Sequence, residues 1–381
     1  MTRGLLAAEK AATIAALSEN SVRRPSTTSP APSAVATPAP KRRRLLELDA
    51  FRGIASIGVL LFHYYYHVFE VIGPEGREIG LFSYLSNYGQ YGVELFFMIS
   101  GFVIFMTLER TTQVVAFVRS RFARLFPVYW LSILITSAVV HSFGLPGREV
   151  SLSHTLINFT MLEEFANVDK VDGAYWTLTL ELCFYVLIGA AFFMGALRRF
   201  HVCIGVFLAG LGVAQLLRHL SAFELPWKVR TFFLVEYGHL FALGMVLYQI
   251  YKHESMVPRL RSGLLLLGCI ALAFFHGPLV GSLVIGFTGL FFAFMHGWLR
   301  FLAIRPFLFF GTISYSLYIV HQNCGYVMLR ELTDAGMAWP LAQVLTCAAA
   351  VVVATGMTYF VERPVARWVR NWEKRRGPRL V

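Results

Sequence analysis

Arg52 and His63 lie eleven residues apart in one hydrophobic stretch, and both side chains can carry charge. An α-helix turns about 100° per residue, so eleven residues return to within about 20° of the same face, roughly 16 Å further along the axis. Across a hydrocarbon layer about 30 Å thick, this spacing places Arg52 at one water interface and His63 near the middle. Ionisable groups at membrane depth are costly and indicate a function. The alternative is an arginine that extends to the interface beside a hydrogen-bonded core histidine.

Arg121 and Arg124 form a second charged pair, three residues apart and just before Pro127. Residues at this spacing share one face of a helix, and proline favours the first turn of a helix, so we expect a helix to begin near Pro127. Arginine binds phosphate with two parallel hydrogen bonds, and a helix N-terminus favours an anion. The pair therefore suggests a phosphate site, although membrane topology alone also explains arginine at this place.

Glu181 lies five residues into another apolar stretch. A carboxylate there must be protonated or paired. We expect it to pair with a histidine or arginine of the site, or else to form a structural hydrogen bond between helices. His63 and His67 have the spacing of two metal ligands on one helical face, but the sequence offers no third ligand nearby and no HExxH motif. No metal is expected.

The composition indicates an all-α, polytopic membrane protein. Hydrophobic residues make up 56% of the chain and charged residues 15%, against about 25% charged residues in an ordinary soluble domain. Ten apolar stretches are long enough, or nearly so, to cross a bilayer. They are residues 53–72, 89–108, 126–145, 176–196, 200–216, 230–251, 262–276, 278–299, 307–330 and 339–361. Residues 276–278 between the seventh and eighth suggest either a tight turn or a break in one long helix.

The basic residues predict the orientation. With the N-terminus inside, 27 of the 34 Lys and Arg residues fall on the inner side, which places both termini in the cytoplasm. The net charge of +12 then indicates this topology and contact with membrane lipids. No nucleic-acid recognition motif accompanies it, so no nucleic acid is expected as a partner.

Three regions follow from the composition. Residues 1–44 form an Ala/Ser/Pro-rich tail with a basic anchor, and this tail is predicted to be disordered. Residues 45–364 form the membrane domain, and residues 365–381 form a basic cytoplasmic tail. The outer loop at 146–175 suits either a lid over an acceptor or a plain connector. The five cysteines are scattered without a metal or disulfide pattern.

Six motifs in order resemble the acyltransferase 3 family of integral-membrane O-acyltransferases, from about residue 46 to residue 364. They are Leu48–Ala55 with His63, Gly92–Phe102, the Arg121–Trp130 run, Tyr175–Glu181, Gly311–His321, and Glu362–Pro364. Two positions depart from the usual pattern: Thr177 stands where serine is usual, and Ser120 where a further arginine is common. The first keeps a hydroxyl, and the second leaves the arginine pair intact.

The resemblance implies transfer of an acyl group, commonly acetyl, from acetyl-CoA or another acyl-CoA to a hydroxyl acceptor. The donor phosphates would lie near Arg52, Arg121 and Arg124 at the inner face. His63 would act as general base or carry the acyl group transiently, and Glu181 would orient or stabilise it. The possible oxyanion or substrate contacts are Ser100, Tyr318 and His321.

The resemblance also frames the acceptor and the location. We expect a carbohydrate such as a surface or lipid-linked polysaccharide, with a secreted small molecule such as a macrolide as the alternative. A proton-coupled transporter, the alternative from a different class, would bury His and Glu too, but the sequence lacks the half-repeats typical of transporters. The expected location is a bacterial inner membrane. The sequence does not determine the oligomeric state.

Overall fold

Helices form every regular element of the described residues. The structure is a computed structural model that describes residues 45–72, 80–111, 113–221, 223–253 and 256–375. The elements within these ranges are α-helices joined by short 3₁₀ and π segments. The prediction of an all-α protein is therefore confirmed. The predicted tail at 1–44 and the last residues of the predicted tail at 365–381 lie outside the described residues.

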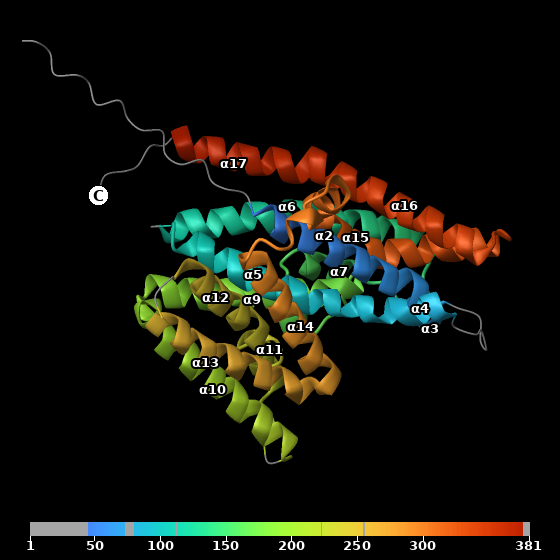
Figure 1. Cartoon of the computed structure of the whole chain (residues 1–381). Helices are drawn as coiled ribbons and strands as arrows, with labels where there is room; N and C mark the ends of the chain where they lie inside the picture. Colours follow the sequence, from blue (N-terminus) through green and yellow to red (C-terminus); the bar gives the residue numbers. More distant parts are fainter. Residues whose placement is uncertain (1–44, 73–79, 112, 222, 254–255, 376–381) are drawn as a thin grey trace, which may run out of the picture. The chain divides into compact units, whose positions relative to one another are not determined.

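The elements follow the chain in the colour order of Figure 1. They are α2 (Leu46–Leu61), η1 (Phe62–His67), α3 (Val68–Val71), α4 (Leu81–Ser86), η2 (Asn87–Tyr91), α5 (Gly92–Leu108), α6 (Val114–Phe143), α7 (Leu152–Asn158), α8 (Glu163–Ala166), η3 (Gly173–Tyr175), α9 (Trp176–Phe193), η4 (Ala196–Arg199), α10 (Phe200–His219), α11 (Trp227–Phe232), α12 (Gly238–Lys252), α13 (Met256–Ala273), η5 (Phe274–His276), α14 (Pro278–Met295), η6 (Arg300–Leu302), α15 (Arg305–Asp334), α16 (Trp339–Met357), η7 (Thr358–Glu362) and α17 (Arg363–Arg375).

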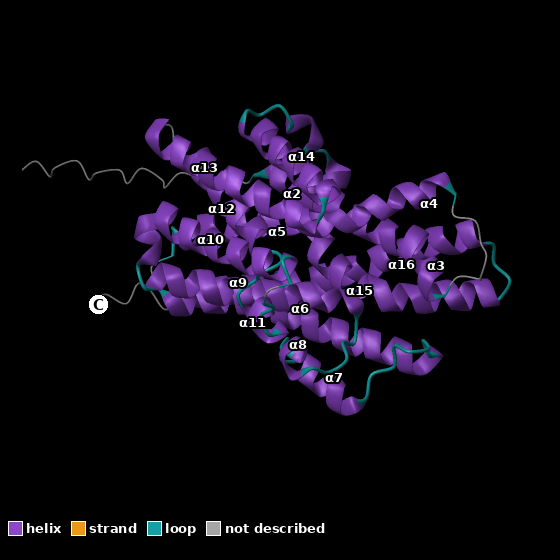
Figure 2. Ribbon diagram, turned by 90° about the horizontal axis from the view of Figure 1, so that it is seen from below, coloured by secondary structure: helices purple, strands orange, loops and turns teal. Residues whose placement is uncertain are grey.

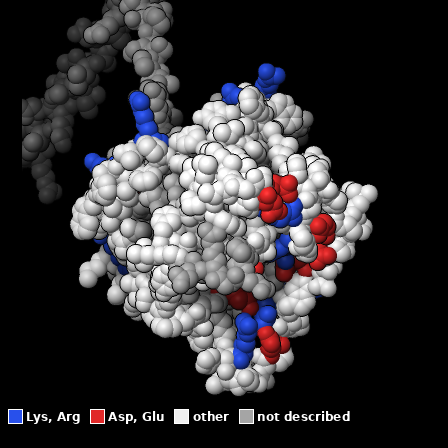
Figure 3. Space-filling view, turned by 90° about the vertical axis from the view of Figure 1, so that its right-hand side faces the viewer, with Lys and Arg blue, Asp and Glu red and all other residues white. Residues whose placement is uncertain are grey.

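Eight helical segments of the described residues are long and apolar enough to cross a membrane. They are Leu46–Val71, Leu81–Leu108, Val114–Phe143, Gly173–Phe193, Ala196–His219, Arg259–His276, Pro278–Met295 and Trp339–Trp372. Figure 3 shows the face at the right-hand side of Figure 1, on which the acidic side chains in view lie toward one side, with basic side chains beside them and at other edges.

Two of the ten predicted spans differ from these eight. The stretch 230–251 is divided between α11 and α12, with Leu234 in a left-handed conformation (φ 57°) between them, so the continuous helix α12 has only 15 residues. The stretch 307–330 lies inside the 30-residue helix α15, whose buried face includes Ser314, Ser316 and Asn323. These polar residues lower the mean hydropathy of α15. The helix can hold them because they are buried against neighbouring helices. The count of ten spans stays a prediction.

The seventh and eighth predicted spans are two separate helices. α13 with η5 ends at His276 and α14 begins at Pro278. Gly277 between them has φ 110°, a conformation that favours glycine. α14 returns to pack against α13 and η5, so residues 276–278 form a tight turn.

The expected helix start near Pro127 is wrong. α6 runs without interruption from Val114 to Phe143, with Pro127 inside it. Arg121 and Arg124 therefore lie in the second and third turns of a helix and do not precede its N-terminus. A proline inside a helix removes one backbone hydrogen bond, which neighbouring helices can offset in a membrane protein. A phosphate site at a helix N-terminus is excluded at this position.

The last predicted span also continues further than expected. A π-helical turn, η7, connects α16 to α17, and the amphipathic α17 reaches Arg375. α17 packs against α6, and the Arg119 guanidinium carbon lies 4.6 Å from the ring centre of Trp372. A helix therefore crosses the predicted boundary at residue 364.

α15 occupies a central position, packed against α2, α6 and α16. Figure 2, seen from below, shows α7 and α8 beyond α6, at the side of these helices. Glycines allow the close contact between α2 and α15. A Cβ atom on Gly53 would lie 2.2 Å from the Phe307 carbonyl oxygen, and one on Gly311 would lie 1.9 Å from that of Asp49. Small residues of this kind let two membrane helices touch along their backbones. This contact positions the residues of α2 and η1 against those of α15.

Candidate active site

Two adjoining cavities contain most of the predicted site residues. The narrow cavity, of about 70 Å³, is lined by Arg52, Arg124 and Glu181 among others. The wide chamber, of about 670 Å³, is lined by His63 and by a largely polar set of side chains. Val93 and Tyr318 line both. The arginines and the histidine therefore face two spaces that meet at these two residues.

Arg52 and Arg124 bring two cations from α2 and α6 to the narrow cavity. Glu181 of α9 lines the same cavity, and its carboxylate accepts a short hydrogen bond from the Tyr185 hydroxyl. Glu181 interacts electrostatically with both arginines, as does Glu362 at the end of η7. Carboxylates offset part of the cost of burying these cations, because a buried charge without a partner is strongly unfavourable.

Arg121 lies apart from Arg124 and lines a separate apolar groove between α6 and α9. Its guanidinium lies 5.9 Å from the ring centre of Phe117 and 5.8 Å from that of Tyr185, and it donates to Ser120 Oγ over 3.0 Å. Tyr185 therefore contacts Arg121 on one side and Glu181 on the other. Of the three predicted donor-binding arginines, two line the narrow cavity and the third lies behind it.

His63 lies in the π-helical segment η1, where the chain leaves the α-helical register of α2. π-helical turns inside α-helices occur often at functional sites because they redirect side chains. His63 faces the wide chamber, whereas Arg52, eleven residues earlier, faces the narrow one. The two residues thus point toward connected spaces from one continuous helical segment.

Hydrogen bonds fix the position of the proton on His63. His321 Nδ1 lies 2.8 Å from the Tyr318 carbonyl oxygen and 3.1 Å from that of Leu317, so this nitrogen must carry the proton. In the neutral ring, Nε2 of His321 is then an acceptor, and it lies 3.1 Å from His63 Nδ1. His63 Nδ1 also lies 2.9 Å from the Val59 carbonyl. Both contacts need a donor, so Nδ1 of neutral His63 carries the proton and Nε2 is the basic nitrogen.

His321 thus contacts His63 directly and does not line either cavity. It is 1% exposed, and its own carbonyl accepts a 2.6 Å hydrogen bond from the Tyr64 hydroxyl. Gly325 leaves room for this tyrosine, since a Cβ atom there would lie 2.2 Å from the Tyr64 hydroxyl oxygen. Both side chain and backbone of His321 are held in place.

Hydroxyl groups surround the junction of the two cavities. Tyr318 lines both spaces, and its hydroxyl oxygen lies 3.1 Å from Thr177 Oγ1. Ser100 of α5 lines the narrow cavity together with Thr177. Thr177, the residue that departs from the usual serine, therefore contacts Tyr318 through a hydroxyl that serine would also supply.

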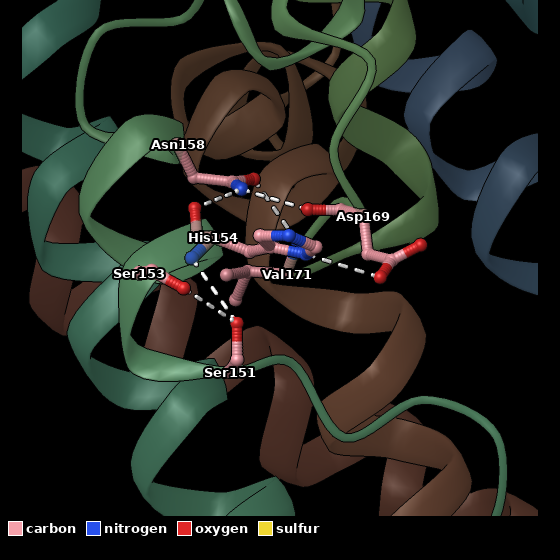
Figure 4. A network of polar contacts seen from close by, with 6 residues as sticks. All are labelled: Ser151, Ser153, His154, Asn158, Asp169 and Val171. Atoms are coloured by element: carbon pink, nitrogen blue, oxygen red, sulfur yellow. Dashed lines mark hydrogen bonds and ion pairs between the residues drawn. The ribbon is translucent and has the colours of Figure 1, made fainter.

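The loop at residues 146–175 is folded against the bundle. Figure 4 shows Asn158 between His154 and residues 169–171, where it donates to the Asp169 carbonyl over 2.9 Å and accepts from the Val171 amide over 3.0 Å. The Asp172 carboxylate accepts from the Asn323 amide of α15 over 2.9 Å. The loop therefore connects to α15 two residues beyond His321.

Two carboxyl groups of this loop are buried. Burial raises the pKa of the Asp172 carboxyl to about 6, although its backbone donors act in the opposite direction. Burial also raises the pKa of Glu163 to about 7, against the lowering effect of the Lys170 charge. Glu163 Oε1 lies 3.5 Å from the Tyr129 hydroxyl of α6. These contacts tie the loop to α6 and α15.

Glu181 and His63 line different cavities, and the expected orienting role of Glu181 stays a prediction. Glu181 lines the narrow cavity and His63 the wide chamber. Glu181 was expected to pair with a histidine or an arginine of the site. Arg52 and Arg124 are the ones that line its cavity. His321, expected as a substrate contact, is the residue that contacts His63. Sequence position gives the depth of a residue but not its neighbour across the bundle.

The wide chamber also contains residues without a predicted role. Glu94 and Trp176 line it, together with Gln90, Gln322 and Arg148. Glu94 and Trp176 fall within two of the family motifs, which is the only signal that sequence reasoning had for them. As for metals, no cluster of three or more His, Cys, Asp or Glu residues suited to an ion occurs in the part of the chain that the structure describes.

The fold defines a helical membrane protein with two adjoining internal cavities. Comparison with known proteins identifies its family. The family model described as an acyltransferase domain matches residues 45–359, so the chain belongs to this acyltransferase family, and the protein is an acyl-transferring enzyme.

Two relatives illustrate the family. The chain is 27% identical over 299 residues to the exopolysaccharide production protein ExoZ of Rhizobium meliloti (strain 1021), covering 73% of this chain and 90% of ExoZ. It is 26% identical over 153 residues to the acyltransferase MdmB of Streptomyces mycarofaciens, covering 39% of each chain. No solved structure matches the chain.

Proposed function

We propose that the protein transfers an acyl group, acetyl in the first place, from acyl-CoA to a hydroxyl of a carbohydrate such as a surface or lipid-linked polysaccharide. The observation that carries this proposal is the pair of adjoining cavities, with arginines in one and the basic nitrogen of His63 facing the other. The similarity to an exopolysaccharide production protein, over 73% of this chain and 90% of that protein, supports a carbohydrate acceptor.

The narrow cavity suits the donor. Arg52 and Arg124 provide positive charge for its phosphates, and the pantetheine arm would extend along the cavity that they line. The thioester then meets the wide chamber at Tyr318. Arg121 lies behind this cavity. It would act on the donor indirectly, through its electrostatic interactions with Tyr185 and Glu181. The positive-inside pattern places the arginine side in the cytoplasm, where acyl-CoA occurs.

His63 then serves as general base. Its Nε2 removes the proton of the acceptor hydroxyl as the oxygen attacks the thioester carbonyl carbon. The carbon–sulfur bond breaks, and the CoA thiolate takes up the proton from the imidazolium. His321 accepts from Nδ1–H of His63 and so stabilises the ring as it becomes charged. Tyr318 or Ser100 would donate to the developing oxyanion, because both line the cavity that ends at the junction.

The same geometry allows a covalent route, in which Nε2 of His63 attacks the thioester and carries the acyl group before the acceptor binds. Rapid mixing of purified enzyme with acetyl-CoA and no acceptor, with the released CoA thiol followed over time, distinguishes the two routes. A burst of thiol equal to the enzyme concentration with wild type, absent from His63→Ala, would identify the acyl-histidine. A wild-type enzyme that shows no burst but turns over once acceptor is added would identify base catalysis.

The proposed function is tested by transfer of label from acetyl-CoA to the polysaccharide fraction of bacterial inner-membrane vesicles that contain the protein. We expect transfer with wild type and a decrease of about 10²–10⁴-fold in His63→Ala, the usual range for loss of a general base or acid. His67→Gln serves as the matched control, since it changes the neighbouring histidine of the same chamber. Equal transfer by wild type and His63→Ala would remove His63 from the mechanism.

A further inference from the structure

Glu94 is a carboxylate in the wide chamber that the mechanism does not use. It lies in the first turn of α5, and its Oε2 is buried with no hydrogen-bond partner among the described residues. Burying such an atom without a partner is unfavourable, most of all when it carries charge. Glu94 thus has the property of a binding group whose partner arrives with a ligand.

The other carboxylates near the two cavities behave differently. Glu181 accepts from Tyr185, and Glu362 accepts from Ser316 over 3.5 Å. Glu70, at the chamber's edge, has a side chain that is 61% exposed. Water therefore solvates Glu70, and protein groups satisfy the other two. Glu94 alone of these four is both enclosed and left with an unsatisfied oxygen.

The wall beside Glu94 is aromatic and rigidly packed. The rings of Trp176 and Tyr237 both line the chamber, with centroids 5.2 Å apart. Phe97, one turn beyond Glu94 in α5, packs against both, at 6.4 Å from Trp176 and 5.4 Å from Tyr237. The chamber therefore combines this aromatic wall with a largely polar lining, which suits a ligand that has both an apolar face and hydroxyl groups.

We infer that Glu94 and Trp176 bind the acceptor and select one with several hydroxyl groups. Glu94 accepts a hydrogen bond from a hydroxyl other than the one that His63 deprotonates, while the C–H face of the sugar ring packs on Trp176. A carboxylate suits this task because it only accepts hydrogen bonds, and each hydroxyl of the acceptor has one proton to donate. Gln90 and Gln322, which also line the chamber, can bind further hydroxyls. This inference rests on the proposed function, since it assumes that the chamber holds the acceptor.

The test compares two acceptors with purified enzyme and acetyl-CoA: methyl glucoside, which has several hydroxyls, and ethanol, which has one. For Glu94→Gln we expect the apparent KM for methyl glucoside to rise roughly 10–100-fold, the loss of a charge-assisted hydrogen bond. The KM for acetyl-CoA and the rate of ethanol acetylation should stay within about twofold of wild type on the same argument. Glu70→Gln makes the same chemical change at the exposed edge of the chamber and should leave all three quantities unchanged.

Wild-type enzyme that uses ethanol as well as methyl glucoside would overturn the inference, as would a Glu94→Gln variant that matches wild type with both. Equal losses with both acceptors would also overturn it, because they would indicate a structural role. Failure of the proposed function has a different signature: wild type that neither hydrolyses acetyl-CoA nor transfers its acetyl group. Trp176→Ala provides a second test. We expect it to raise the KM for methyl glucoside, and we expect Trp176→Phe to raise it less.

Discussion

The narrow cavity and the wide chamber differ in size, charge and the way their walls are built. The narrow cavity, of about 70 Å³, is lined by charged groups of opposite sign, Arg52 and Arg124 with Glu181, which interact electrostatically. The chamber, of about 670 Å³, leaves a carboxylate oxygen of Glu94 without a partner. The arginines of the narrow cavity suit the same anionic donor in every reaction cycle. The larger chamber, with polar groups such as Glu94 that lack a partner, suits a bulky acceptor rich in hydroxyl groups. This difference predicts separate effects of mutations on donor and acceptor.

The largest effect on the narrow cavity should come from Arg52→Ala combined with Arg124→Ala. Removal of both cations should raise the apparent KM for acyl-CoA by roughly 10–100-fold, since a hydrogen bond to a charged group contributes about 1.5–3 kcal/mol. Steady-state kinetics with varied donor and constant acceptor measure this. The double lysine variant keeps the charge and should recover part of the affinity. A change in acceptor KM of equal size would contradict the separation of the cavities.

Arg121→Ala separates the third arginine from this pair. Because Arg121 lies behind the cavity, its loss should raise the donor KM less than the loss of Arg52 or Arg124 alone. Side-by-side titrations of the three single variants with acyl-CoA provide the measurement. An effect of Arg121→Ala as large as that of the other two would place the donor phosphates in the groove between α6 and α9.

Glu181→Gln should lower the donor KM severalfold. The carboxylate offsets part of the charge of the two arginines, so a neutral side chain leaves more positive potential for the donor phosphates. Because Glu181 lines a different cavity from His63, the pH profile of turnover should keep its shape. A shifted profile would restore the role of Glu181 in orienting His63.

His321→Gln tests the positioning of His63. The Val59 carbonyl still holds the proton on His63 Nδ1, so we expect a decrease of less than about tenfold in kcat, with both KM values unchanged. The pH–rate profile should also shift, because His321 no longer accepts from the charged ring. An unchanged profile with reduced protein yield would indicate packing alone.

Glu163 should produce the smallest effect, on stability alone. Burial raises the pKa of Glu163 to about 7 in the folded protein. Between the ordinary pKa of a glutamate and pH 7, the folded state therefore binds more protons than the unfolded state. The contribution of this group to stability is therefore greatest in acid and decreases as the pH rises toward 7. Thermal unfolding of wild type should show a higher Tm at pH 5 than at pH 7.5, and Glu163→Gln should reduce this difference. A pH dependence identical in the two proteins would contradict the burial of a titrating Glu163.

Much of the fold could be predicted from the sequence because its signals are local. Apolar stretches located eight segments that the structure confirms as long and apolar enough to span, and the six motifs identified the family. The exceptions, α12 and α15, have physical causes: the first is shortened by a left-handed residue, and the second turns polar side chains toward its neighbours. Pro127 misled the prediction because proline permits either a helix start or a helix interior in a membrane.

The sequence by itself determined the helical membrane class and the family. Helical periodicity and hydrophobicity act over a few turns, so one stretch of sequence contains all that they need. Only the tertiary structure decided which side chains meet: His321 with His63 across 258 positions, and Glu181 with the arginines. It also decided that Glu94 stays unpaired beside Trp176. Such contacts depend on how distant helices cross and on the glycines that let them approach, and these features have no local signature.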